Sequence, residues 1–144
     1  MGQISDVMTR DHKTCDESFF EAEAAARDGD WPRTVAAVNA YRDALERHFR
    51  IEEAALFPAF EGATGATEGP TAVMRAEHDD MRDLLDQLRT AAVACEADEF
   101  LGIAETLSVV MQQHNFKEEQ VLYALLDETL GDEVAALLEE VAHV

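Results

Sequence analysis

The stretch His48-Phe49-Arg50-Ile51-Glu52-Glu53 returns 66 positions later as His114-Asn115-Phe116-Lys117-Glu118-Glu119. In both copies a histidine and a glutamate stand four positions apart, so on an α-helix their side chains project from one face. The first copy continues an apolar seam, because positions 38, 41, 45, 48, 52 and 55 read Val, Tyr, Leu, His, Glu and Ala. An unpaired carboxylate in a core costs several kcal/mol. Polar residues on this seam therefore need a specific partner.

The same pattern, with seam residues alternately three and four positions apart, runs through three more segments. It covers positions 8, 12, 15 and 19, then 74, 78, 81, 85, 88, 92 and 95, and finally 100, 104, 107, 111, 114, 118, 121 and 125. Breakers separate the segments, with Asp30 as a candidate N-cap and Pro32 in the first turn that follows. We predict helices at about 4–28, 31–60, 70–95 and 98–126, and a short tail helix at about 131–142.

Four such helices with short connections favour an all-α fold, an antiparallel up-down-up-down four-helix bundle. We expect it to form a single domain over residues 1–144, closed by the short C-terminal helix. Hydrophobic residues make up 47% of the chain, which is enough for a packed core.

The charge of the chain limits the partners that we expect. Asp and Glu number 31 against 11 Lys and Arg, a formal charge of −20. A surface this negative repels phosphate backbones and anionic lipid, so we expect neither nucleic acid nor a membrane as a partner. No signal peptide or membrane-spanning run is visible in the sequence, and we expect a cytoplasmic protein. We expect no disulfide between Cys15 and Cys95, which lie at different levels of the bundle.

Four of the five histidines fall at one level of the predicted bundle. His12 lies 16 residues before the end of its helix and His48 lies 17 residues after the start of the next. At 1.5 Å per residue both sit about 25 Å from the connecting turn. The same arithmetic brings His78 and His114 to that level, whereas His143 falls in the tail and is expected at the surface.

The polar layer is also duplicated. Adding 66 to the numbers of His12, His48 and Glu52 gives His78, His114 and Glu118, so the chain reads as two related hairpins. Two equivalent halves predict two metal ions, each with two imidazoles from one hairpin, bridged by the two carboxylates. Mixed imidazole and carboxylate ligands suit iron or manganese, and zinc would not need six ligands.

These residues resemble the hemerythrin-like family, also called the HHE cation-binding domain. The resemblance spans roughly residues 5–126 and rests on Asp11-His12, on the two repeated stretches with Leu56-Phe57-Pro58 and Leu122-Tyr123, and on Glu77-His78. It implies a four-helix bundle that holds two Fe ions as an oxo- or hydroxo-bridged, non-haem di-iron centre. Carried over by position, it implies terminal ligands at His12, His48, His78 and His114 and bridging ligands at Glu52 and Glu118. Manganese and mixed pairs share these ligands and stay open.

One position departs from the oxygen-carrying members of that family. They have a further histidine one turn before the third-helix ligand, and this chain has Met74 there. The departure implies an open position on each iron and weakens the case for reversible oxygen carriage. Glu53, Glu77 or Glu119 would either fill such a position or be exposed acids beside the seam. Cys15, one turn after His12, is either a small core residue or a sensor of oxidant.

Three functions follow as alternatives. The first is a di-iron protein that binds O₂ or another small diatomic or peroxide ligand, in oxygen or redox sensing, iron handling or oxidative-stress defence. The second is an enzyme with peroxidase or NO-reducing activity at the same centre. The third is a metal-free helical interaction protein. Nothing in the sequence names a protein partner.

Overall fold

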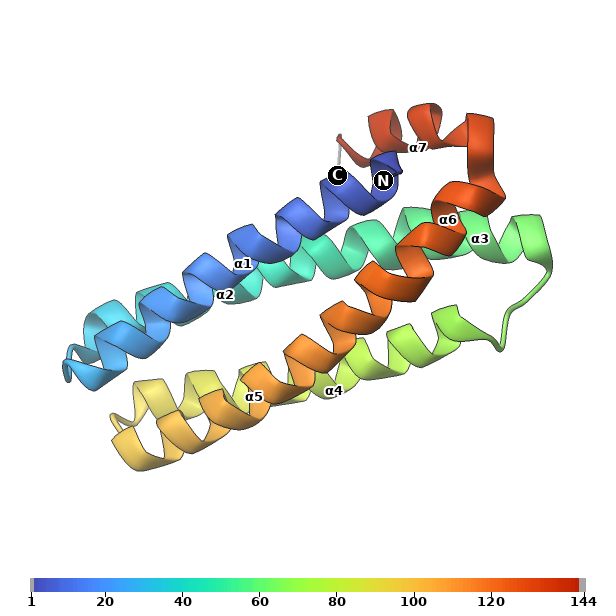
Figure 1. Cartoon of the computed structure of the whole chain (residues 1–144). Coiled ribbons are helices and arrows are strands. Elements are labelled where there is room, and N and C mark those ends of the chain that lie inside the picture. Colours follow the sequence, from blue (N-terminus) through green and yellow to red (C-terminus); the bar gives the residue numbers. More distant parts are fainter. Residues whose placement is uncertain (1, 143–144) are drawn as a thin grey trace.

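A computed structural model describes residues 2–142 and shows four long helical rods. They are α1 (Gln3–Arg27), then α2 (Trp31–Ile51) with η1 (Glu52–Leu56) and α3 (Phe57–Thr64), then α4 (Pro70–Val93), and then α5 (Ala97–Lys117) with η2 (Glu118–Leu122) and α6 (Tyr123–Leu130). A 3₁₀ turn, η3 (Gly131–Glu133), leads into α7 (Val134–Val141). The predicted antiparallel four-helix bundle is confirmed (Figure 1). The described helices include none that is long and apolar enough to cross a bilayer.

Local sequence signals set the ends of the helices. The side chain of Asp30 caps α2 by accepting a hydrogen bond from the Arg33 amide, and Pro32 lies in the first turn. Gly65, with a φ of 74°, ends α3 in the left-handed region. The third helix ends at Val93 and not at residue 95, and Cys95 follows with a φ of 57° and an exposed side chain. Its predicted place on the buried seam was therefore wrong. His143 lies outside the described residues.

A carboxylate near the other end of the chain holds the start of α1. No side chain of α1 caps its own N-terminus. Instead, Asp127 of α6 accepts hydrogen bonds from the Ile4 amide at 2.9 Å and from the Ser5 amide at 3.1 Å and hydroxyl at 3.0 Å. An anion at a helix N-terminus satisfies free amides and opposes the helix dipole. This contact fixes α1 against α6, and α7 packs beside the same end of α1 (Figure 1).

Two apolar clusters fill the bundle on either side of one polar layer. The cluster at the hairpin turns includes Phe19, Tyr41 and Leu88, and the cluster at the opposite end includes Ile4 and Leu126. Between them lie buried polar side chains at positions 12, 48, 52, 78, 114 and 118. The seam histidines and glutamates thus occupy one interior level.

The second and fourth rods each contain one turn of π-helix just after the polar layer. In η1 the Phe57 amide donates to the Glu52 carbonyl, and in η2 the Tyr123 amide donates to the Glu118 carbonyl. These i→i+5 bonds insert one extra residue into the turn and shift the inward face by one position. Beyond the polar layer the fourth rod therefore buries Leu122 and Leu126, in place of the predicted seam positions 121 and 125. Val121 is 53% exposed, and its predicted burial was wrong.

Candidate metal centre

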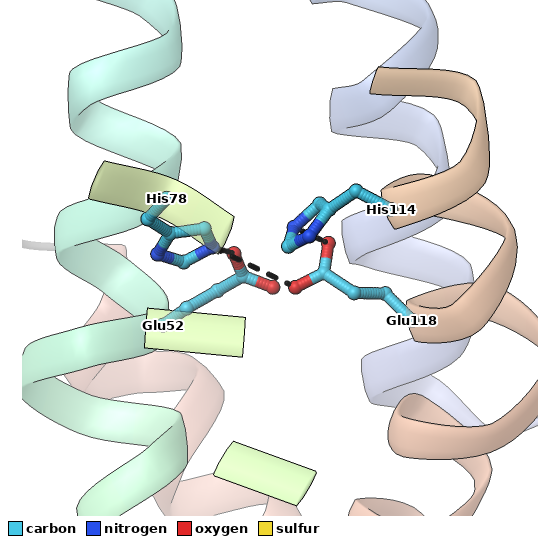
Figure 2. A group of neighbouring side chains, drawn as sticks. All are labelled: Glu52, His78, His114 and Glu118. Carbon is cyan, nitrogen blue, oxygen red and sulfur yellow. Dashed lines mark ion pairs between the residues drawn. The ribbon is translucent and has the colours of Figure 1, made fainter. Parts of the chain in front are cut away.

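The six polar seam residues meet inside the bundle. All are at most 4% exposed. Figure 2 shows four of them, Glu52, His78, His114 and Glu118, pointing toward one another from opposite sides. Their candidate ligand atoms lie within 4.8 Å of one another, and so do those of His12, His48 and Glu118. We call His78 with His114 the His78 half-site, and His12 with His48 the His12 half-site.

Each glutamate reaches the imidazoles of both hairpins. Glu118 Oε1 lies 3.1 Å from His12 Nε2 and 3.2 Å from His114 Nε2. Glu52 Oε1 lies 3.1 Å from His78 Nε2 and 3.4 Å from His48 Nε2. Each carboxylate thus has imidazole neighbours from both hairpins.

Protein groups do not satisfy the hydrogen-bonding capacity of this cluster. Four of its buried polar atoms have no hydrogen-bond partner: Glu52 Oε1, His78 Nε2, His114 Nε2 and Glu118 Oε2. Buried polar atoms are ordinarily paired, and leaving one unpaired costs about 1–3 kcal/mol. A cation accepts lone pairs from these imidazole and carboxylate atoms together. The donor set therefore fits a transition-metal site.

The outer nitrogen of every imidazole has its own carboxylate. Asp11 lies 2.6 Å from His48 Nδ1 and Glu77 lies 2.8 Å from His114 Nδ1. Glu53 lies 2.6 Å from His78 Nδ1 and Glu119 lies 2.7 Å from His12 Nδ1. An Nδ1–H that donates to a carboxylate leaves the Nε2 lone pair aimed at the interior, which is the arrangement typical of metal-binding histidines.

This arrangement changes how three acids of the sequence are interpreted. Glu53, Glu77 and Glu119 were expected either to fill an open metal position or to be exposed acids. Each instead hydrogen-bonds the outside of an imidazole, and each is only 22–29% exposed. Asp11, which completes the set, was not expected in this role. A signal for all four existed in the sequence, since Asp11 and Glu77, like Glu53 and Glu119, are 66 positions apart.

Basic side chains support the His78 half-site from outside. Arg82 contacts both oxygens of Glu53, at 3.0 and 3.1 Å, and lies over the ring of Phe49. Lys117 pairs with Glu77. Burial raises the pKa of Glu53, but the hydrogen bonds from Arg82 and His78 outweigh it and leave that pKa below its usual value.

The matching positions around the His12 half-site lack these cations. Asp16 is the counterpart of Arg82 and Ile51 is the counterpart of Lys117. Burial raises the pKa of Asp16 and outweighs the nearby His12, which lowers it, and the Glu119 carboxylate raises it further. The two halves thus share their inner residues and differ in the charge that surrounds them.

Tyr123 places a hydroxyl inside the cluster. Its oxygen lies 2.8 Å from Glu52 Oε2 and 3.0 Å from Glu118 Oε1, so its proton is donated to the carboxylate pair. It lies 3.1 Å from His12 Nε2 and 3.4 Å from His48 Nε2. Burial and both carboxylates raise the pKa of Tyr123 well above its usual value, so the phenol keeps its proton. In the sequence Tyr123 stood out as part of the family resemblance.

Charge inside the cluster is balanced by protons when no cation is bound. Burial lowers the pKa of His48, but the neighbouring carboxylates, Glu52 first, raise it overall to about 10. Burial and the Glu118 carboxylate raise the pKa of Glu52 to about 8. Because a cation favours neutral imidazole and ionised carboxylate, metal and protons compete for these atoms.

Two other predicted neighbours have simpler roles. Met74 is 4% exposed and packs in the apolar cluster with Ile4 and Leu126, at the end of the bundle opposite the hairpin turns. Cys15 is buried, and burial raises the pKa of its thiol to about 12. Since a reactive cysteine needs a thiolate, both features favour the core-residue alternative for Cys15 over the oxidant sensor.

Comparison with known proteins places these observations in a family. Residues 3–126 match the family model of the hemerythrin HHE cation binding domain. The iron-sulfur cluster repair protein YtfE of Edwardsiella ictaluri is 33% identical over 112 residues, which cover 70% of this chain and 49% of that protein. A DNA nickase of Nostoc sp. is 28% identical over 132 residues, which cover 90% of this chain and 35% of that protein. The chain thus spans half or less of each relative, and no solved structure gives a significant match.

Proposed function

The chain belongs to the hemerythrin HHE cation-binding domain family, and we propose that it is a non-haem di-iron protein that binds O₂ or a related small oxidant. We assign it to oxygen or redox sensing, iron handling or oxidative-stress defence. The unpartnered buried atoms of Glu52, Glu118, His78 and His114 carry the proposal, because a cation satisfies all of them at once.

Each inner residue has a proposed part in holding iron. His78 and His114 would bind one ion through Nε2, His12 and His48 would bind the other, and Glu52 and Glu118 would bridge the two. Iron held in this way supplies redox chemistry and binds small ligands. The protein's own contribution is to orient the imidazoles through their outer carboxylates and to exclude water with the apolar clusters on both sides.

One of the relatives supports the proposed role of iron. The YtfE relative is named for the repair of iron-sulfur clusters, in keeping with iron handling or oxidative defence. The nickase relative does not support a DNA-directed role for this chain. That protein is nearly three times as long as the matched segment, and the −20 charge of this chain repels a phosphate backbone.

Metal analysis with an optical spectrum tests the proposal. We expect two irons per purified chain and the near-ultraviolet absorption of an oxygen-bridged diferric pair, which zinc does not give. Two manganese ions, or one iron and one manganese, would support a two-metal centre and would correct only the identity of its metal. Zinc, or a chain that takes up no metal, would contradict the proposal and favour a helical interaction protein.

A second function, a peroxidase or NO-reducing enzyme, is favoured by Met74. This buried thioether stands where oxygen carriers of the family have a further imidazole, so the centre has fewer protein ligands to block a reacting molecule. Turnover separates the two functions. A stoichiometric, reversible spectral change with O₂ indicates binding, whereas catalytic loss of hydrogen peroxide or nitric oxide indicates an enzyme.

A further inference from the structure

We propose that the Tyr123 hydroxyl is the hydrogen-bond donor that this centre offers to a small ligand, and that it selects ligands with an acceptor atom. The class includes dioxygen, peroxide and small anions such as azide. The inference rests on the proposed di-iron function and adds a specificity-determining residue to it.

The position of the hydroxyl is the first argument. Four ligand-type atoms surround it within 3.4 Å: one oxygen each of Glu52 and Glu118, and the Nε2 atoms of His12 and His48. Among the hydrogen bonds of the described residues, Tyr123 supplies the only hydroxyl that reaches these inner imidazole nitrogens. A small molecule that enters the His12 half-site therefore meets this donor.

The π-turn is what aims the hydroxyl inward. Tyr123 follows Glu118 by five positions, and on a regular α-helix the two side chains would leave different faces. The i→i+5 bond from the Tyr123 amide to the Glu118 carbonyl stacks the two residues, and their side chains approach to 3.0 Å. Single π-turns of this kind are frequent at functional sites.

The duplicated half of the chain gives an internal comparison. The counterpart of Tyr123 is Phe57, which also follows a π-turn and also reaches the cluster. Its ring stacks on His78, with centroids 5.8 Å apart and planes at 22°. Phe57 fills the same kind of space without a polar atom, so packing alone does not require the hydroxyl at position 123.

Metal binding would free the hydroxyl for a ligand. Its present acceptors are Glu52 Oε2 and Glu118 Oε1, which belong to the two carboxylates proposed to bridge the ions. Once these oxygens give electron density to cations, they become weaker acceptors for the phenol. A buried hydroxyl keeps a partner where it can, and an acceptor atom of a bound ligand supplies one.

Azide titration of the iron-loaded full-length chain tests this role, with Tyr123→Phe as the variant and Tyr41→Phe as the matched control. Tyr41 is the chain's other tyrosine. It is buried in α2 and packs on Phe19, away from the six cluster residues. We expect the Kd for azide, read from its visible absorption band, to rise about tenfold in Tyr123→Phe, equivalent to about 1.4 kcal/mol. Tyr41→Phe should stay within about twofold of the wild type.

A second readout separates hydrogen bonding from general damage. The infrared stretching frequency of bound azide should shift in Tyr123→Phe alone, while both variants keep two irons per chain. Unchanged azide affinity and frequency in an iron-loaded Tyr123→Phe protein would overturn the inference and leave the di-iron proposal standing. Loss of iron from Tyr123→Phe would also overturn it, because Tyr123 would then support the metal and not the ligand. A wild-type chain that takes up no iron would refute the proposed function itself.

Discussion

The two halves of the polar centre have the same inner residues and different surroundings. The His78 half-site is held by Arg82 and Lys117, and its imidazole His78 lies against the ring of Phe49 at a centroid distance of 4.0 Å. At the matching positions the His12 half-site has Asp16 and Ile51 in place of these cations, and it faces the Tyr123 hydroxyl. The repeat thus keeps the six inner residues and the four outer acids, whereas Arg82 and Lys117 have no basic counterpart. We infer that the His78 half-site is the more firmly held of the two, because its outer carboxylates are themselves paired with cations.

Removing a carboxylate that serves both halves should have the largest effect. Glu118 approaches imidazoles of both hairpins, so Glu118→Ala should reduce iron from two ions to less than one per chain. Elemental analysis checks this, with Glu105→Ala on the exposed face of α5 as the control. A Glu118→Ala protein that keeps two irons would show that Glu118 does not bridge.

Removing one imidazole at a time, from one half-site or from the other, should show which half-site binds iron more tightly. The ligand-type atoms of His78 and His114 lie together with those of both Glu52 and Glu118, whereas those of His12 and His48 lie together with those of Glu118 alone. His12→Ala should therefore keep about one iron per chain, whereas His78→Ala should keep clearly less. The comparison is read from the iron that remains after a fixed challenge with a chelator. Equal losses from the two variants would mean that the different surroundings do not change the affinity for metal.

The sequence predicted much of this centre because duplicated polar residues on an apolar seam are conspicuous. Its periodicity indicated the bundle, and the six inner residues followed from their position on the seam. The π-turns were not predicted, because Glu118–Leu122 has an ordinary helical composition and the i→i+5 bond depends on packing. The inward position of Tyr123 was missed for that reason. The role of the outer carboxylates was missed, because the 66-position repeat that marks these four acids among 31 does not show that they contact the imidazoles.

Removing the outer support of one half should have a moderate effect. Arg82→Met keeps the aliphatic stem but loses the hydrogen bonds to Glu53, so His78 is less firmly oriented. We expect the affinity of the more tightly bound iron to fall about tenfold, the low end of the range for such outer partners. Competition with a chelator measures it. Arg89→Met serves as the control, because exposed Arg89 bonds only to Asn39, away from the polar layer.

The smallest expected effect is on the pH dependence of the metal-free protein. The pKa of His48 is about 10 in the fold against 6.5 when free, so its stabilising contribution is complete below pH 6.5 and is lost as the pH rises toward 10. The raised pKa of Glu52, about 8 against 4.5, acts in the same direction between those values. The Tm of the metal-free chain should therefore fall by several degrees between pH 6.5 and 9.

The iron-loaded chain is the control for that prediction. A bound cation replaces the protons as the source of positive charge, so the Tm of the loaded protein should vary much less over the same range. A metal-free Tm that stays constant or rises with pH would contradict the proposed proton balance of the cluster.

Anomalous diffraction at the iron edge, from crystals of the iron-loaded chain, tests the central claim most directly. Two peaks are expected inside the bundle, one beside His78 and His114 and one beside His12 and His48, with Glu52 and Glu118 between them. A single peak, or peaks outside this layer, would contradict a centre in which six inward side chains hold two metal ions.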